Sequence, residues 1–416
     1  MSKAVLIGSE IYRNSQFGGK HPLSIPRVSA VLDLIRAIGI CDKDEYQTGP
    51  CAKPELLQRF HTPEYISVLK KTEVSQKISE IDAKTYNIGS LSNPVFPEMF
   101  KRPATSVGSS LLAADLVADG GRAYSLGGGL HHGMAGYANG FCFLNDLAFA
   151  INRLRELGIQ RVAYIDLDAH HCDGVTAAFP EDENLFIVSA HEEKRWPFTG
   201  GIEENLVDRF LNIPLPSRCN DTEYMFVFEN LVFPLLERFQ PEALIIQGGA
   251  DALKDDPMSR LSLSNQVLYK VLGVLLGLSH RVILTGGGGY NPWTVSRLWT
   301  GFWALLSGRS IPESLPATAI DLLKSLSWQR KTMPKESLLT SIRDVPLESY
   351  GPSDVLSIPS PSLQIQTHAQ LPIHLELRPE GLSHHASKKD VWALTQQAEY
   401  AVPSHAQGES PWPRLQ

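Results

Sequence analysis

Six short apolar runs constrain the fold of this 416-residue chain more than any other feature. A strand with one wet face alternates polar and apolar residues, whereas a continuous apolar run is typical of a strand covered on both faces. Each run is bounded by turn or loop residues and has the length of a strand, not of a helix. The runs span residues 3–8, 123–126, 161–166, 185–191, 243–247 and 281–285.

Segments with helical spacing of apolar residues separate these runs. Strands that alternate with helices return to the same edge through crossovers and so form a parallel sheet. The chain is therefore predicted to be an α/β protein whose parallel sheet is buried on both faces. The clearest helices are expected at 28–35, from 61–65 onward, and at 104–118, 146–157 and 264–278.

Glycine-rich or polar loops follow five of the six runs. In parallel sheets, function gathers in the loops after the carboxyl ends of the strands. These loops share one edge of the predicted sheet, so we expect one site built from several of them. They span residues 127–141, 166–174, 191–201, 248–258 and 286–290.

The densest group of polar side chains lies in the loop 166–174. Residues two apart in an extended segment point the same way, so Asp168 and His170 can converge on one point. Asp166 and Asp173 are then left to hold or orient neighbouring groups. Carboxylates and imidazoles are ligands of divalent metals. Acids are also common in turns, but this many carboxylates after a buried strand repel one another unless a cation is bound.

Asp251 is the expected third metal ligand. A catalytic zinc site has about three protein ligands and an open position. Asp251 follows the run 243–247 and three small residues, which places it at the same edge as Asp168 and His170. Alone, it would be read as a turn or capping residue.

His131 and His132 follow three glycines and are expected beside the metal rather than on it. A neutral imidazole near a metal site is suited to general-base catalysis, because its ordinary pKa is about 6.5. Asp166 and Asp173 are available to fix the two tautomers. Core histidines satisfied by backbone groups are the alternative.

Tyr290 follows four glycines, and its phenol is suited to hydrogen-bond a carbonyl oxygen as negative charge develops. Phe141 and Trp196 are candidates for an apolar entry, although aromatic residues are more often core. A metal, a base and a phenol donor together predict amide hydrolysis. No motif for redox or phosphoryl-transfer chemistry and no nucleophilic Ser or Cys arrangement is present.

Composition is that of an ordinary globular enzyme, with 43% hydrophobic and 20% charged residues. A net charge of −7 gives no reason to expect nucleic-acid or membrane binding. The five cysteines form no CxxC pair, which favours a reducing compartment. No apolar stretch suits a secretory signal or a bilayer span, so we expect a cytoplasmic protein.

The composition changes near residue 345. The chain beyond is rich in Pro and Ser and poor in core-forming residues. We therefore predict a domain at 1–345 and an extension at 346–416 that is partly ordered or disordered. One short helix is expected at 388–400. Five histidines of the extension are expected to be inert: His368, His374, His384, His385 and His405.

Six separated motifs resemble the zinc-dependent histone deacetylase family, in its bacterial acetoin-utilisation branch. They are GGGLHH, NGFCFLND, DLDAHHCDG, RWPFTG, GGADALKDDPM and GGGGY, and the resemblance covers about residues 1–345. It implies the arginase/deacetylase fold, three α/β/α layers around a parallel sheet of about eight strands. It also implies deacetylation of an acylated lysine in a protein or peptide, or of a small acylated amine.

The resemblance implies a role for each site residue. Zinc would be bound by Asp168, His170 and Asp251, and structural K⁺ by backbone groups near Asp166, Asp168, His170, Ser189 and Ala190. His132 would be general base and acid, and His131 would assist it electrostatically. Asp166 and Asp173 would be the carboxylates that bond the two histidines. Tyr290 would polarise the carbonyl of the substrate. Gly140 would accept the substrate N–H, Phe141 and Trp196 would line the tunnel, Met258 its floor, and Arg27 an internal acetate channel.

One departure concerns the substrate. In eukaryotic relatives of the family an Asp of the rim loop clamps the peptide backbone, and Ser92 occupies that position here. A hydroxyl cannot accept two N–H groups as a carboxylate does. The hypothesis is that peptides are held weakly or that a smaller acylated amine is preferred.

Three alternatives are open. A ureohydrolase similar to arginase needs a second metal, but residue 253, where a further acid would be needed, is Leu. An acetylpolyamine amidohydrolase usually carries an inserted loop that builds a dimer, and no clear insertion is present. A non-catalytic acyl-group binder would not need a base. The sequence leaves the oligomeric state open.

Overall fold

The structure is a computed structural model that describes residues 3–13, 17, 21–328, 330 and 334–347. Eight parallel strands form one sheet in the order β2-β1-β3-β8-β7-β4-β5-β6. The strands are β1 (Val5–Gly8), β2 (Tyr46–Thr48), β3 (Gly121–Ser125), β4 (Val162–Asp166), β5 (Leu185–Glu192), β6 (Phe210–Leu215), β7 (Ala243–Gln247) and β8 (Arg281–Thr285).

Successive residues of the central strands enter two different cores. In β4, Ala163 and Ile165 pack into one core, whereas Val162 and Tyr164 pack into the other. Strand side chains alternate between faces, so a strand apolar at every position fills both cores. The predicted sheet with two buried faces is confirmed.

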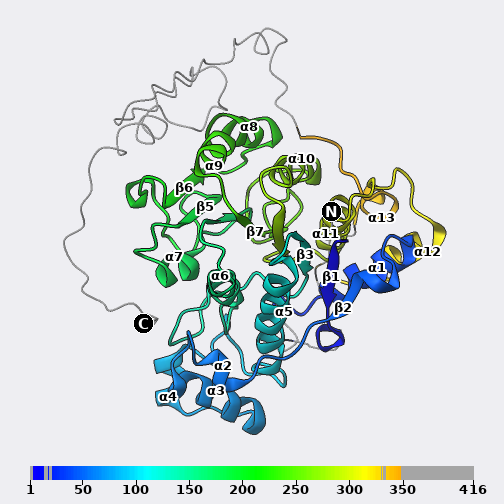
Figure 1. Ribbon diagram of the computed structural model, residues 1–416. Coiled ribbons are helices and arrows are strands. Elements are labelled where there is room, and N and C mark those ends of the chain that lie inside the picture. The colour runs from blue at the N-terminus through cyan, green and yellow to red at the C-terminus, as the bar shows by residue number, and fades with distance from the viewer. Residues whose placement is uncertain (1–2, 14–16, 18–20, 329, 331–333, 348–416) are drawn as a thin grey trace, which may run out of the picture.

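Helices cover both faces of the sheet (Figure 1). The core that holds Ile165 also contains residues of α1, α10 and α11, and the opposite core contains residues of α3, α5 and α6. The helices are α1 (Val28–Ile38), α2 (Pro54–Leu57), α3 (Pro63–Ser75), α4 (Glu80–Tyr86), α5 (Lys101–Val117), α6 (Asp146–Glu156), α7 (Asp173–Ala178), α8 (Asp221–Val227), α9 (Phe233–Phe239), α10 (Asn265–Leu275), α11 (Pro292–Leu306), α12 (Ala317–Ser325) and α13 (Glu336–Thr340).

The two edge strands were not among the predicted runs. β2 has only three residues and is partly exposed, so it lacks a continuous apolar signal. β6 contains Pro214, which is tolerated at an edge because no further strand needs its N–H. Edge position therefore explains both omissions.

Helix α11 was also missed, because its sequence is apolar almost all round and shows no amphipathic stripe. Trp299 and Trp303 are fully buried in it. The indole N–H of Trp299 donates to the carbonyl oxygen of Gly248, 2.8 Å away. The most buried helix is thus bonded directly to the loop that carries Asp251.

The tail predictions fall almost wholly outside the described residues, including the helix at 388–400 and the five histidines. Ordered contacts continue to Leu347, whose N–H donates to Asp221.

All five cysteines are free thiols, as expected; the cytoplasmic location stays a prediction. Within the described ranges, no helix has both the length and the apolar character needed to cross a bilayer.

Two helical glycines give a matched test of packing at the sheet. A Cβ on Gly108 of α5 would lie 2.0 Å from the carbonyl oxygen of Pro50, whereas one on Gly273 of α10 would meet nothing within 4 Å. We expect Gly108→Ala to lower the free energy of unfolding by about 1–3 kcal/mol. Gly273→Ala should raise it by about 0.5–1 kcal/mol through helix propensity. Urea unfolding of both variants measures this, and equal stabilisation would contradict the backbone contact at Gly108.

Candidate metal centre and active site

Asp168, His170 and Asp251 converge at the carboxyl edge of the sheet. Each offers a ligand atom, and these atoms lie within 4.8 Å of one another. Nδ1 of His170 is 3.0 Å from a carboxylate oxygen of Asp168 and 3.0 Å from one of Asp251. The convergence follows from topology, because β4 and β7 are neighbours in the sheet. The structure brings the three predicted ligands together.

Glycines make room for the two carboxylates. A Cβ on Gly288 would lie 2.1 Å from Oδ2 of Asp251, and one on Gly249 would lie 2.3 Å from Oδ2 of Asp168. The N–H of Gly288 instead donates to Asp168 at 2.8 Å. The glycine-rich loops after β7 and β8 therefore allow main chain to approach the cluster closely.

The charges of the cluster call for a cation. Burial raises the pKa of Asp251, and the Asp168 carboxylate raises it further, to about 6. Burial lowers the pKa of His170, but the Asp251 and Asp168 carboxylates outweigh it and raise it to about 10. The two carboxylates thus favour a positive charge between them, which a divalent metal would supply. Two carboxylates and one imidazole fit zinc with an open position.

His131 and His132 lie side by side, with ring centroids 3.9 Å apart. Nδ1 of His131 donates to Asp166 at 2.7 Å, and Nδ1 of His132 donates to Asp173 at 2.6 Å. Nε2 of His131 lies 3.9 Å from Asp168, on the side of the metal cluster. Both predicted histidine–carboxylate pairs are present.

The two histidines differ in charge. Burial disfavours protonation of His131, but Asp166 and Asp168 outweigh it and raise its pKa to about 9. Burial lowers the pKa of His132 to about 4, and the charge on His131 adds to this shift. The surroundings of His132 therefore favour its neutral form, which can accept a proton, whereas the two carboxylates beside His131 favour its protonated form.

Tyr290 lies over the same edge. Its N–H donates to Asp256 at 2.6 Å, and its ring packs edge-on against Phe141 at 5.8 Å. Burial raises the pKa of Tyr290 well above 10, so the phenol keeps its proton. Its hydroxyl makes no hydrogen bond to any described residue and is left for a ligand.

Aromatic rings surround the approach to the cluster. The Trp196 ring lies 4.6 Å from that of His132 and 6.4 Å from that of His170, and it is 37% exposed. A Cβ on Gly140 would lie 2.3 Å from Trp196, so only glycine fits there. Phe141 has φ of +68°, an unfavourable backbone conformation outside glycine, and its N–H donates to the side chain of Asn93 at 3.1 Å.

The remaining predicted residues, Met258, Ser92 and Arg27, lie outside the ligand cluster, and their roles stay predictions. Met258 is half-buried after Asp256, to which its N–H donates. Ser92 is exposed, and its carbonyl accepts from His21. Arg27 donates to the carbonyl of Gly287, the residue before Gly288, whose N–H donates to Asp168.

Sequence reasoning missed four residues that hold the site together. Gln247 donates to Asp168 at 2.9 Å, and Asn139 donates to Asp173 at 2.8 Å. Asp256 accepts the N–H of Tyr290. Asp146 accepts the N–H groups of Gly129 and Leu130, directly before the histidine pair. Polar ends of buried strands and Asp after a glycine-rich motif are the only sequence signals for them.

His171 belongs to a neighbouring cluster and not to the metal centre. Its Nδ1 bonds the Thr199 hydroxyl at 2.8 Å, and its ring lies 5.1 Å from that of His191. It therefore links the 166–174 loop to the 191–201 loop. The backbone expected to hold K⁺ lies close by, since Asp166 pairs with Ser189 across β4 and β5.

A parallel α/β/α fold with a buried group of potential metal ligands and two paired histidines at its carboxyl edge is the arrangement expected of a metal-dependent hydrolase. The chain belongs to the histone deacetylase family: the family model described as the histone deacetylase domain matches residues 21–306. It is accordingly a hydrolase of the deacetylase type.

Relatives and solved structures agree. The acetoin utilization protein AcuC of Bacillus subtilis is 33% identical over 345 residues, which cover 80% of this chain and 88% of that protein. Histone deacetylase clr6 of Schizosaccharomyces pombe is 32% identical, with 73% and 76% covered. The crystal structure of an HDAC homolog from Aquifex aeolicus matches with a TM-score of 0.80 and 36% identity, covering 85% of this chain and 98% of that one. The arginase/deacetylase fold implied by the motifs is confirmed.

Metal content tests the cluster. Asp168→Ala removes one of three ligands and should abolish stoichiometric zinc binding, because the two that remain do not close a site. Asp173→Asn alters a carboxylate of the same loop that lies outside the cluster, so its zinc content should equal that of the unchanged chain. Elemental analysis after dialysis measures both. We expect one ion per chain; two would favour the ureohydrolase alternative, and full zinc content in Asp168→Ala would refute the assignment.

Proposed function

We propose that this protein is a zinc-dependent amidohydrolase that removes an acetyl or other short acyl group from an N-acylated amine such as acetyl-lysine. The observation that carries the proposal is the arrangement of a neutral His132 and a free Tyr290 phenol around the Asp168–His170–Asp251 cluster. Zinc held by that cluster supplies Lewis-acid chemistry, polarising an amide carbonyl and acidifying a water molecule.

The histidine dyad moves the protons. Asp173 accepts from Nδ1 of His132, which leaves Nε2 free to take a proton from the attacking water and later to give it to the departing amine. His131, held positive by Asp166, stabilises negative charge that develops beside it. The two histidines thus have separate roles although they are adjacent in sequence.

Tyr290 and the entrance act on the substrate itself. The Tyr290 hydroxyl donates to the carbonyl oxygen as it becomes negative. The unbranched acylated side chain of the substrate lies between the rings of Phe141 and Trp196. The carbonyl of Gly140 accepts the N–H of the substrate amide. Met258 closes the floor beside the acyl group. The same proposal includes a catalytic domain that spans residues 1–345. It also includes structural K⁺, which would be held by backbone groups near Asp166, Asp168, His170, Ser189 and Ala190.

Tyr290→Phe tests the oxyanion role. Loss of one such donor costs about 10²–10³ in kcat, while zinc content should not change, since Tyr290 is not in the ligand cluster. Tyr46→Phe, on the edge strand β2, is the matched control and should keep full turnover. Hydrolysis of an acetyl-lysine peptide is the measurement. Unchanged turnover in Tyr290→Phe would remove the role assigned to the phenol.

The amine is tested with an acyl-lysine and acylpolyamine panel. Ser92 offers no carboxylate to bind the backbone N–H groups of a peptide. The kcat/KM for acetylated peptides should therefore exceed that for free acetyl-lysine by no more than about fivefold, which corresponds to about 1 kcal/mol of transition-state stabilisation. Ser92→Asp should raise kcat/KM for peptides and leave that for free acetyl-lysine unchanged. A strong preference of the unchanged chain for long peptides would contradict the hypothesis. A preference for acetylpolyamines would favour the second candidate, an acetylpolyamine amidohydrolase.

Turnover also decides the non-catalytic alternative. A binder of acyl groups has no use for the neutral imidazole of His132 or for the carboxylate that orients it. If the zinc-loaded chain hydrolysed no acylated amine of the panel yet bound one, the binder would be favoured.

A further inference from the structure

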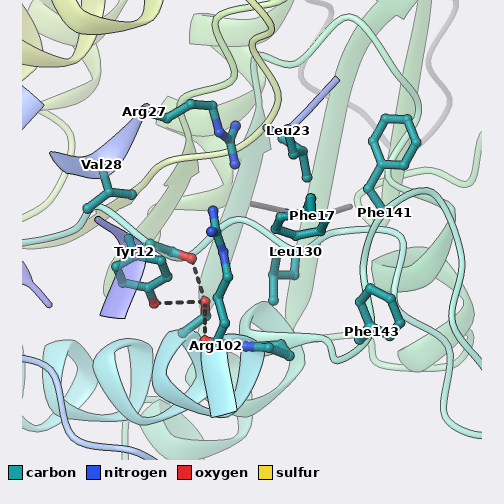
Figure 2. A pocket seen from close by; sticks show the side chains of 12 residues that line it. Tyr12, Phe17, Leu23, Arg27, Val28, Arg102, Leu130, Phe141 and Phe143 are labelled. Atoms are coloured by element: carbon teal, nitrogen blue, oxygen red, sulfur yellow. Dashed lines mark hydrogen bonds between the residues drawn. The ribbon is translucent and has the colours of Figure 1, made fainter. Parts of the chain in front are cut away.

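Two aromatic side chains, Phe141 and Trp196, border the approach to the metal-ligand cluster. Phe141 is held by a neighbouring loop, because its N–H donates to the side chain of Asn93 at 3.1 Å. Its ring also lines a cavity on the inner side of this approach, whose wall includes the buried Arg102 (Figure 2). Trp196 belongs to a different loop, so other contacts position its ring.

The main chain around Trp196 is strained. Lys194 and Phe198, two residues before and after it, have φ of +57° and +64°, a region that residues other than glycine rarely adopt. The Phe198 side chain is 75% exposed, so its own packing does little to offset this strain. Such a conformation persists only where surrounding contacts impose it. The Trp196 ring, which packs against that of His132, therefore depends on the contacts that hold the 191–201 loop.

His171 fastens this loop directly after Phe198. Its Nδ1 forms a hydrogen bond of 2.8 Å with the hydroxyl of Thr199. The main chain of Gly200 lies on the imidazole, since a Cβ there would be 2.5 Å from the ring. His171 follows the expected metal ligand His170 and is only 2% exposed. The loop is thus tied to a buried residue beside the metal-ligand cluster.

Other bonds hold the two ends of the loop. At one end, Arg195 donates to Glu192 at 2.9 Å. At the other, Nε2 of His191 donates to the carbonyl of Gly200 at 3.0 Å. Both ends remain fastened when the bond to His171 is lost. We therefore expect that loss to displace the segment between them locally and to leave the fold intact.

Packing alone does not account for an imidazole at residue 171. The Nε2 of His171 is buried and has no hydrogen-bond partner among the described residues. An apolar side chain of similar size would fill the same space without an unpaired polar atom, which is unfavourable in a protein interior. The bond from Nδ1 to Thr199 is the feature that the imidazole supplies.

We propose that His171 is a positioning residue for the entrance of the active site: through Thr199 it holds the Trp196 ring in the place that admits an acylated side chain. The inference rests on the proposed function. The Trp196 ring borders the entry, whereas the reacting amide lies at the metal-ligand cluster. Loss of the bond therefore weakens substrate binding and leaves the chemical step largely intact, so that KM rises more than kcat falls.

The first experiment measures kcat and KM of the full zinc-loaded chain on an acetyl-lysine peptide. Thr199→Val removes the hydroxyl but keeps the branched shape. It should raise KM by about three- to tenfold, the equivalent of one hydrogen bond, while kcat falls by less than about twofold. Thr199→Ser keeps the hydroxyl and should keep the KM of the unchanged chain. Thr318→Val, on α12, loses a hydroxyl bond to the carbonyl of Ala37 and should change neither constant.

A double-mutant cycle assigns the effect to His171. His171→Leu removes the other partner of the same bond, so Thr199→Val should raise KM no further in that background. Zinc content is measured in each variant, because His171 is adjacent to His170. If His171→Leu does not fold, Thr199→Val and the fluorescence of Trp196 decide.

The second experiment follows the Trp196 ring itself and needs no turnover. Acrylamide quenching of tryptophan fluorescence is measured for the unchanged chain and for Trp196→Phe, and the difference reports Trp196. Thr199→Val should increase the quenching of this component, because the ring leaves its contact with His132. Thr199→Ser and Thr318→Val should leave the quenching unchanged.

Two results would overturn the proposal while leaving the deacetylase intact. One is an unchanged KM together with unchanged quenching of Trp196 in Thr199→Val. The other is a rise in KM that persists in full in the His171→Leu background, since the effect would then not pass through their bond. Increased quenching of Trp196 in a chain that hydrolyses no acylated amine would instead support the anchoring of the ring and refute the proposed function.

Discussion

The architecture of the active-site edge depends on the repulsion between two carboxylates, Asp168 and Asp251, buried at the ends of neighbouring strands. In a low-dielectric site such a pair is unfavourable unless donors and a cation compensate it. Three donors bond these two carboxylates. The N–H of Ala169 donates to Asp251, and the N–H of Gly288 and the side-chain amide of Gln247 donate to Asp168. The glycines of these loops follow from the same pair of carboxylates, because a Cβ on Gly249 or Gly288 would collide with an oxygen of Asp168 or Asp251.

The positions of the buried carboxylates also make the pKa values of His131 and His132 differ. Asp166 and Asp168 raise the pKa of His131 and favour its protonated form. Burial and the neighbouring His131 lower the pKa of His132, which has one carboxylate partner, and favour its neutral form. Neighbouring titratable groups whose pKa values are pushed apart are the usual way in which one site holds an acid and a base at the same pH. No additional residue is needed to distinguish them, since position relative to the carboxylates is sufficient.

The sequence predicts what depends on local pattern and on sheet topology. Apolar strands such as β4 and the two-residue spacing of Asp168 and His170 are local, and Asp251 follows from the common edge of parallel strands. Asp256 and Gln247 could not be predicted, because they serve backbone or side-chain groups that are distant in sequence. The burial of Arg102 could not be predicted either, because the sequence pattern of a helix does not distinguish a buried arginine from a solvated one.

Phe141 links the outer entrance to the inner cavity. Its ring contacts Tyr290 and lines the cavity, while its N–H donates to the buried Asn93, 3.1 Å away, in the loop that carries Ser92. With φ of +68°, this backbone is held by the bond to Asn93 and by the two hydrogen bonds between Asn139 and Cys142 on either side of it. Loss of the Asn93 side chain would therefore remove one of these supports and affect both the Phe141–Tyr290 contact and the wall of the cavity.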